Sequence, residues 1–438
     1  MLLAHRRHPD ADVLYKPQQA RGQAMTPPQS AGVRGSIQGL APETLLHILE
    51  YLELRIDIHA FVRTCQRFFL VGSPCLYRHN EYGQTALHLA AANGDLEVTK
   101  LLLKGEVDLN AEDNFHQTPL SVAAIRGHEA IVLLLLPVIQ PSALLHAAAN
   151  GHRAVVEQLL ATNQIGPDYK GSDGRTPLSL AAANGHKAVV RFLLAKAGVG
   201  PDSRDHIGRT PLSWASWNGH EEVVEILVVT DGVSLDSEDD DRRTPLSLAA
   251  GKGHETVVQL LINTGANLDS TDKHGRTPLS FAAEDGSVAV VRLLLDSGAA
   301  WDSKDSKYGQ TPLSFAAQHG CNMVVRYLLL TDGVDPESRD SNGRTPLSLA
   351  AESWHELVVW ILLHTNGVDP ASEDTNGQTP LSWAEAMERD RWPKRNPVAK
   401  LLKDAIAERE TLRESSVRTW TLFSLLLLLS IFSIKSHY

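Results

Sequence analysis

Apolar residues recur along most of this chain at the spacing of short amphipathic helices that come in pairs. In one such pair, Leu178, Ala181 and Ala182 form an apolar stripe on the first helix. Val190 and Leu194 belong to the corresponding stripe of the second helix. The pattern predicts helix pairs that bury one side each.

The same unit returns down the chain and begins with Thr-Pro-Leu or a close variant. Its starts are Thr85, Thr118, Thr176, Thr210, Thr244, Thr277, Thr311, Thr345 and Thr379. Apart from one gap, successive starts are 33 or 34 residues apart. This period indicates an array of structural repeats.

Each part of the unit has a physical role. Thr176 is predicted to cap the first helix, because its hydroxyl can accept from an orphaned backbone N–H. Pro177 follows at the first helical position, where its missing N–H costs nothing. Gly185 ends the helix, and residues 198–205 have the Gly, Pro and Asp content of a projecting turn.

Helix pairs this short cannot bury their apolar sides alone, so stacking on neighbours is obligatory. The unit resembles the ankyrin repeat over residues 81–403, about three quarters of the chain, in ten copies. The resemblance implies an all-α fold with β-turn fingers, an ankyrin-repeat solenoid that binds a protein partner.

The array departs from the usual Thr-Pro-Leu-His pattern. Only His88 keeps the histidine in its full setting, and His146 is interpreted as its counterpart in a truncated copy. Serine stands there elsewhere, at Ser121, Ser179, Ser213, Ser247, Ser280, Ser314, Ser348 and Ser382. Together with the Gly-Val-Asp-Pro segments 333–336 and 367–370, this resembles fungal ankyrin arrays.

One junction is short. His128 and His152 are 24 residues apart, whereas His152 and His186 are 34 apart. Pro137 cuts the second helix short, and no Thr-Pro-Leu precedes Ala143. We therefore predict that one finger is missing between residues 137 and 143.

Composition narrows the function classes. The formal net charge is −11 and there is no long Lys/Arg tract, which argues against nucleic acid. Three cysteines without a CxxC pair suit a reducing compartment, cytoplasmic or nuclear. Residues 1–38 are interpreted as a disordered segment, with an organelle transit peptide as the alternative.

No catalytic constellation is found, so we expect no enzyme, no cofactor and no metal site. Six histidines recur at one structural position, the entry to the second helix, and are interpreted as structural. They are His128, His152, His186, His220, His254 and His355.

Partners of ankyrin domains generally contact the turn tips and the exposed face of the first helix. The resemblance therefore places Arg175, Arg209, Arg243, Arg276 and Arg344 in a groove, with Gln84, Gln310 and Gln378 in the same row. They either grip a partner or pair with acidic turn residues such as Asp173 and Asp241.

Tryptophans divide between two predicted places. Trp217 is a candidate exposed anchor in the groove, because it offers a large apolar area and an N–H donor. Trp214 is assigned to a core position that Phe281, Phe315 and Trp383 share.

Residues 39–80 are predicted to form a small helical module that resembles the F-box, beginning with Leu40-Ala-Pro-Glu43. Ala41 and Thr44 depart from the family's usual Pro and Leu. The resemblance implies docking to the Skp adaptor of a cullin–RING ubiquitin ligase. The contacts would be Leu40, Pro42, Glu43, Leu45, Leu46, Ile48 and Leu49. The alternative is an N-terminal cap that shields the first repeat.

Beyond the array, residues 404–419 are predicted to be a charged helical linker, and residues 420–434 are an uncharged hydrophobic tail. At about 1.5 Å per helical residue the tail is shorter than the roughly 30 Å hydrocarbon layer of a bilayer. It is either an anchor in a thin membrane, a helix packed on the array or a mispredicted terminal exon. The first functional hypothesis is a substrate receptor for ubiquitination; the rival is an ankyrin scaffold or sensor without a ligase link, tethered or free.

Overall fold

The computed structural model describes residue 80 and residues 82–105, 107–137, 140–386 and 396–411. The helical module that begins at residue 39 lies outside these ranges up to residue 79, and so does the tail 420–434. The adaptor contacts Leu40, Pro42, Glu43, Leu45, Leu46, Ile48 and Leu49 therefore remain predictions.

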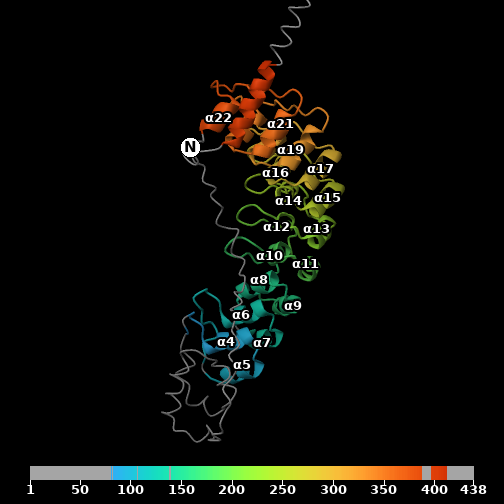
Figure 1. Ribbon diagram of the computed structural model, residues 1–438. Coiled ribbons are helices and arrows are strands. Elements are labelled where there is room, and N and C mark those ends of the chain that lie inside the picture. Colours follow the sequence, from blue (N-terminus) through green and yellow to red (C-terminus); the bar gives the residue numbers. More distant parts are fainter. Residues whose placement is uncertain (1–79, 81, 106, 138–139, 387–395, 412–438) are drawn as a thin grey trace, which may run out of the picture.

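The described chain consists of paired short helices joined by turns (Figure 1). Inner helices begin the pairs and outer helices complete them. The inner helices are α4 (Ala86–Asn93), α6 (Pro119–Arg126), α8 (Pro141–Ala149), α10 (Pro177–Ala183), α12 (Pro211–Asn218), α14 (Pro245–Ala250), α16 (Pro278–Asp285), α18 (Pro312–Gln318), α20 (Pro346–Glu352) and α22 (Pro380–Ala386). The outer helices are α5 (Leu96–Leu102), α7 (Glu129–Leu135), α9 (Arg153–Ala161), α11 (Lys187–Leu194), α13 (Glu221–Val228), α15 (Glu255–Asn263), α17 (Val288–Asp296), α19 (Asn322–Leu329) and α21 (Glu356–Leu363). Residues 397–411 are also helical.

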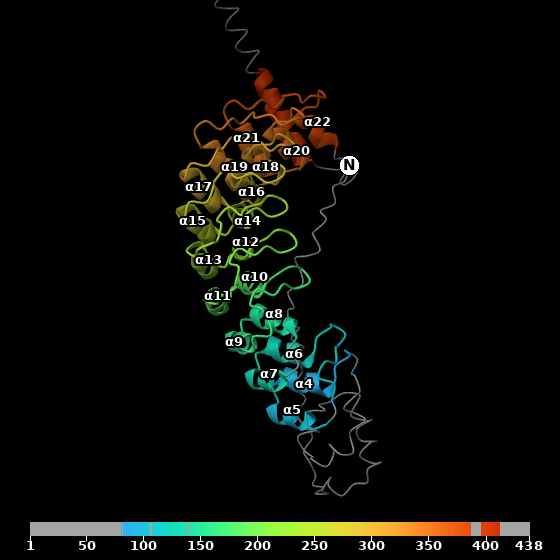
Figure 2. The ribbon, with the colours of Figure 1, turned by 180° about the vertical axis from the view of Figure 1, so that it is seen from behind.

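The pairs stack in sequence order into a curved solenoid, with the turns projecting from one side (Figures 1 and 2). Inner helices pack on the inner helices of the next pair more extensively than outer helices pack on outer ones. The stack therefore bends toward the inner helices. No strand occurs among the described residues, so the predicted all-α solenoid is confirmed.

The predicted threonine caps are confirmed. Thr176 Oγ1 accepts from the N–H of Ser179 at 3.2 Å, and the same bond recurs from Thr118 at 3.3 Å to Thr379 at 3.3 Å. In the first repeat His88 replaces the serine, and its Nε2 also reaches the carbonyl oxygen of Gln117, 2.9 Å away in the next repeat. Most of the serines bond within their own turn, as their shorter side chains require.

One continuous core runs through the stack, and it contains the same few residue types in every pair. Leu178, Ala181 and Ala182 of α10 are fully buried, as are Val190 and Leu193 of α11. Alanine at the inner positions leaves room for neighbouring backbones to approach closely. Leu194 is only partly buried at the edge of this core.

Each of the six recurrent histidines links its own repeat to the one before it. His254 Nε2 lies 3.0 Å from the carbonyl oxygen of Trp217, and its ring packs on Gly219, where a Cβ would come within 2.5 Å of the ring. Gly219 has a φ of +73°, a conformation that glycine adopts without strain. Equivalent bonds run from His128, His152, His186, His220 and His355, at 2.7 to 3.2 Å. The structural interpretation of these histidines is confirmed.

Backbone hydrogen bonds tie neighbouring fingers together. The N–H of His206 donates to the carbonyl of Asp173 at 3.0 Å, and that of Asp240 to the carbonyl of Ile207 at 3.0 Å. Between α7 and α8 the finger is absent: α7 ends at Leu135 and α8 begins at Pro141. Figure 2 shows this gap in the row of turns beside α8. The predicted missing finger is confirmed.

The interpretation of His146 as the counterpart of His88 was wrong. Buried Leu144, Ala147 and Ala148 of α8 correspond to Leu87, Ala90 and Ala91 of α4. This register aligns His146 with Leu89, one position later than His88. Without a Thr-Pro-Leu start, the alignment must be counted back from Gly151 instead.

Candidate partner-binding face

A buried aspartate organises most fingers. Asp205 Oδ1 accepts from the N–H groups of Ile207 at 3.0 Å and Arg209 at 2.8 Å, which closes the turn. The same arrangement recurs at Asp113, Asp239, Asp272, Asp340 and Asp374.

The five predicted groove arginines all lie along this edge, and all five pair with acidic turn residues. Arg243 Nη2 lies 2.9 Å from Asp239 Oδ2 and 3.0 Å from Asp241 Oδ2. Arg276 and Arg344 pair with Asp272 at 3.0 Å and Asp340 at 2.9 Å. Arg175 lies 3.3 Å from Asp173. The pairing that was the alternative to partner binding is thus present, and it holds the row in place.

The guanidinium groups also lie over aromatic rings. Arg175 Cζ is 3.8 Å and Arg209 Cζ is 4.6 Å from the ring centroid of Trp214. Trp214 Nε1 donates to Asp205 Oδ2 at 2.8 Å, so Arg209 pairs instead with Asp239 of the next finger, at 3.5 Å. Cations over indole faces are attracted by the ring quadrupole.

The assignment of the four aromatic residues that share the position of Trp214 to the core needs correction. Trp214 and Phe315 are buried, at 8% and 6% exposure, whereas Phe281 and Trp383 are only half-buried. None of the four belongs to the continuous apolar core of the stack. They are covered by polar neighbours such as Arg276, 4.2 Å from the Phe281 centroid. They form the floor of the inner-helix face.

Trp217 is half-buried rather than exposed, and cations surround it. Arg209, Lys252 and Arg243 lie 4.7, 4.3 and 6.0 Å from its ring centroid. The indole N–H of Trp214 is bonded to an aspartate, but that of Trp217 makes no hydrogen bond within the described part of the chain. Trp217 therefore retains an unused donor.

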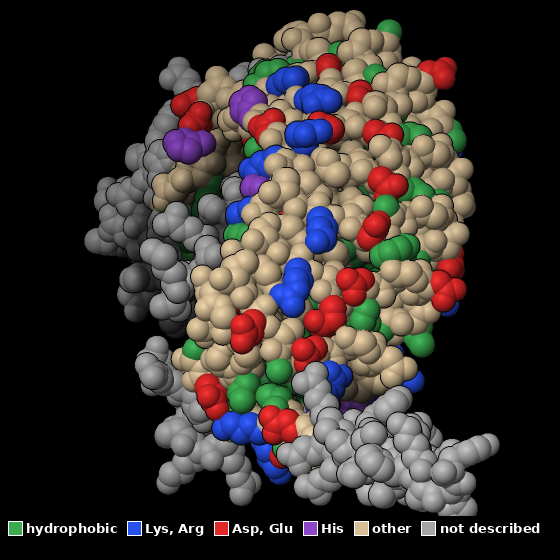
Figure 3. All heavy atoms as spheres, turned by 90° about the horizontal axis from the view of Figure 1, so that it is seen from above, with side chains coloured by type: hydrophobic (Ala, Val, Ile, Leu, Met, Phe, Trp, Pro, Cys, Tyr) green, Lys and Arg blue, Asp and Glu red, His purple; other side chains and the backbone are tan. Residues whose placement is uncertain are grey.

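The close packing of these charged side chains shifts two pKa values. Burial is the main cause that lowers the pKa of Arg209, with repulsion from Arg243 next. A hydrogen bond from Lys273 is the main cause that lowers the pKa of Asp241. Viewed along the stack, Lys and Arg side chains lie beside Asp and Glu side chains on the surface (Figure 3). On this side of the molecule charges of both signs are mixed.

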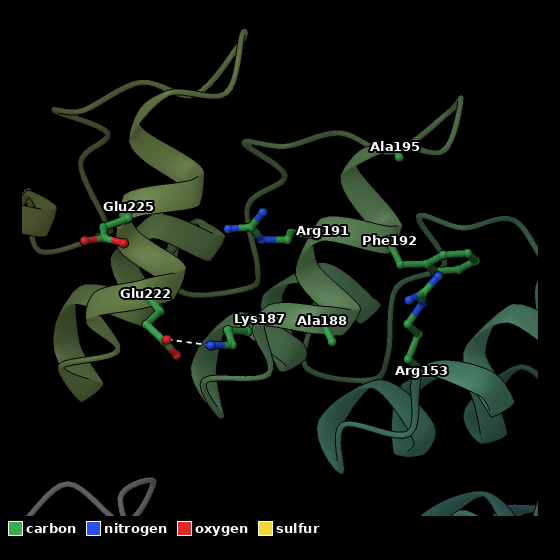
Figure 4. A pocket seen from close by; sticks show the side chains of 8 residues that line it. All are labelled: Arg153, Lys187, Ala188, Arg191, Phe192, Ala195, Glu222 and Glu225. Carbon is green, nitrogen blue, oxygen red and sulfur yellow. Dashed lines mark hydrogen bonds and ion pairs between the residues drawn. The ribbon is translucent and has the colours of Figure 1, made fainter.

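A second, shallow depression lies on the outer helices, and sequence reasoning missed it. Phe192 of α11 has Arg153 on one side, and on its other side lie Arg191 and then Glu222 and Glu225 of α13 (Figure 4). An ion pair of 2.5 Å joins Lys187 to Glu222 across it. Outer-helix positions of this kind look like ordinary solvent-facing residues in the sequence.

Among the described residues, no group of three or more His, Cys, Asp or Glu side chains is placed to hold a metal ion. The same ranges contain no helix that is both long and apolar enough to cross a bilayer. The inner-helix face offers hydrogen-bond donors, cations and ring surface, which are means of recognition.

Stacked helix pairs with linked fingers and one open face define a repeat solenoid. The family profile described as "Ankyrin repeats (3 copies)" matches residues 61–143, 144–239, 231–305, 273–340 and 313–406. The chain belongs to the ankyrin-repeat family. Ankyrin repeats imply interaction with a protein partner.

Known relatives share the repeats and differ otherwise. A probable E3 ubiquitin-protein ligase from Oryza sativa subsp. japonica is 40% identical over 116 residues, 24% of this chain and 25% of the relative. The tyrosine-protein kinase Shark of Drosophila melanogaster is 34% identical over 121 residues, 24% of this chain and 13% of the kinase. The Notch-regulated ankyrin repeat-containing protein A of Danio rerio is 38% identical over 65 residues, which are 14% of this chain and 58% of that protein. The chain thus spans about a quarter of the rice relative's length.

His146 lies at the junction without a finger, and it generates a test. Its Nδ1 atom is buried without a hydrogen-bond partner, and burial lowers the pKa of the imidazole below the ordinary 6.5. The folded state therefore favours the neutral ring, and stability is lost as the pH falls below that value. His146→Leu, which copies Leu89 and Leu180 at this position, is expected to raise the free energy of unfolding by about 1 kcal/mol above pH 6.5.

The stabilisation by His146→Leu should grow as the pH is lowered through 6.5, because leucine does not titrate. Urea unfolding of both proteins across this range measures the difference and cancels the other histidines. A difference that stays constant with pH would contradict the assignment.

Proposed function

We propose that the inner-helix face binds a protein partner, with Arg175, Arg209, Trp217, Arg243, Arg276 and Arg344 as the contact row. The observation that carries this proposal is Trp217, a half-buried indole among three cations with its N–H unused. Tryptophan and arginine dominate binding hot spots, because they combine large contact area with directed donors. The internal pairing of the arginines lowers the entropy lost on binding, since their side chains are already held.

Trp217→Ala is expected to weaken partner binding by about 2 kcal/mol, the threshold for a hot-spot residue. Folding should be retained, because Trp217 lies at the end of α12 and outside the continuous core. Partners found by proximity labelling in the native organism supply the ligand for calorimetry. Trp360→Ala on the outer helix α21 is the matched control, since Trp360 is 49% exposed there. Equal affinity of the two variants would remove Trp217 from the site, and loss of folding would make it a core residue.

We further propose that residues 39–80 link the bound partner to an SCF-type ubiquitin ligase, so that the chain acts as a substrate receptor. Support comes from the F-box-like sequence around Leu40, Pro42 and Glu43, followed by Leu45, Leu46, Ile48 and Leu49. The ubiquitin-ligase relatives are similar only in part of their length, so their activity adds little. In this role the protein works in the cytosol or nucleus.

The ligase link is tested by co-purification of the Skp adaptor with the full chain. Leu45→Asp combined with Ile48→Asp should abolish it, because two carboxylates would be buried in an apolar interface. The free energy of unfolding of the array should not change. If the unaltered protein brings down no adaptor, the rival role applies: an ankyrin scaffold or sensor without a ligase link, tethered through residues 420–434 or free.

A further inference from the structure

The arginines of the row have two kinds of environment, and the difference is the residue eight positions after each arginine. That residue lies at the end of the inner helix, on the same face as the arginine. Arg276 Nη1 lies 3.1 Å from Glu284 Oε2, and Arg344 Nη1 lies 2.8 Å from Glu352 Oε2. Gln310 Nε2 likewise donates to Gln318 Oε1 at 2.9 Å. In this half of the row, a side chain of the helix end closes over each arginine or glutamine.

The preceding three repeats lack this closure. Eight residues after Arg175, Arg209 and Arg243 the chain has Ala183, Trp217 and Gly251. None of these carries a carboxylate. The helix-end side of these three guanidinium groups therefore meets no carboxylate, which defines the open half of the row; the indole of Trp217 lies there instead, 4.7 Å from the buried Arg209.

The carboxylates of the fingers do not balance the positive charge of the arginines equally in the two halves of the row. Arg276 has Asp272 and Glu284, and Arg344 has Asp340 and Glu352. In the open half, by contrast, Arg209 and Arg243 share Asp239, and Asp241 is shared between Arg243 and Lys273. Arg175 meets Asp173 and Asp205 only at 3.3 and 3.8 Å.

A further cation marks the open half. Lys252 is exposed, and its Nζ lies 4.3 Å from the ring centroid of Trp217; it follows Gly251 directly, at the position that Asp285 and Ser353 occupy in later repeats. The row therefore changes from cation-rich over α10, α12 and α14 to acid-compensated over α16 and α20.

On this basis, and resting on the proposed partner-binding face, we propose that the open half binds an acidic segment of the partner. Its carboxylates lie over Arg175, Arg243 and Lys252, and an apolar side chain lies on Trp217, which covers the buried Arg209. Guanidinium groups bind carboxylates through parallel N–H donors, and here the finger aspartates already orient them. The later half, closed by Glu284 and Glu352, takes no part in binding carboxylates.

A nucleic acid fits this site less well than an acidic peptide. Phosphate binding needs a concentrated basic surface, whereas the chain carries a net charge of −11 and Lys252 lies near Asp285. The carboxylates of a peptide need only the local surplus of cations over α10, α12 and α14.

The test places a glutamate where the later repeats have one. Ala183→Glu copies Glu284, because both positions are the seventh residue of their inner helices, α10 and α16. It should close Arg175 and weaken binding of a short labelled peptide of alternating glutamate and serine about tenfold, the effect of one charge-assisted bond. Ala183→Gln is the matched control without charge and should bind like the unaltered protein. Anisotropy at low salt measures binding, and urea unfolding confirms that both variants fold.

Two further arms make the outcome decisive. The same peptide with glutamine for glutamate should not bind, and Glu352→Ala, which opens Arg344 outside the site, should not weaken binding. The proposal is overturned if Ala183→Glu and Ala183→Gln bind alike, if Glu352→Ala weakens binding, or if a single-stranded oligonucleotide displaces the peptide more effectively than free peptide does. Should the acidic peptide fail to bind while Trp217→Ala still weakens the natural partner, the charge preference is wrong and the partner-binding face stands.

Discussion

Each helix pair in this chain buries its apolar side only against the pairs above and below it, and this mutual burial determines most of what the structure shows. Leu178 and Val190 are fully buried only because neighbouring pairs cover them. The histidine that precedes six of the outer helices then reaches back to a carbonyl of the preceding repeat, as His254 does to Trp217. Fingers joined by backbone bonds complete the contact. Repeats stacked in this way leave one long face of inner helices uncovered.

That face obtains its chemistry where the repeats differ. The finger aspartates, the arginines and the ring floor recur, so they form a regular scaffold. Ala183, Trp217 and Gly251 break the regularity by leaving out the glutamate that Glu284 and Glu352 supply. Relatives named for different activities share part of the repeat sequence, which suits a family in which the scaffold is shared and the exceptions select the partner.

Much of the fold could be predicted from the sequence, because its determinants are local and periodic. Thr176 and Gly185 mark the helix ends, and the spacing of His128 and His152 revealed the missing finger. The register of His146 was misjudged, since the landmark motif is absent in that repeat. The site was harder: the sequence gives the row of arginines but not the direction of each guanidinium. Trp214 donates to Asp205, the aspartate that would otherwise pair with Arg209, and only the structure shows such competition.

Native-state hydrogen exchange of the full chain with Gly219→Ala tests the stacking most directly, with Gly265→Ala as the matched control. Both glycines have positive φ, +73° and +93°, so alanine costs about 1 kcal/mol of backbone strain at either. A Cβ at Gly219 would meet the His254 ring at 2.5 Å, whereas one at Gly265 meets nothing within 4 Å. The account predicts that Gly219→Ala lowers protection on both sides of that interface, in α12 and α14 together, and that Gly265→Ala affects only its own turn. Equal and local effects of the two substitutions would contradict it.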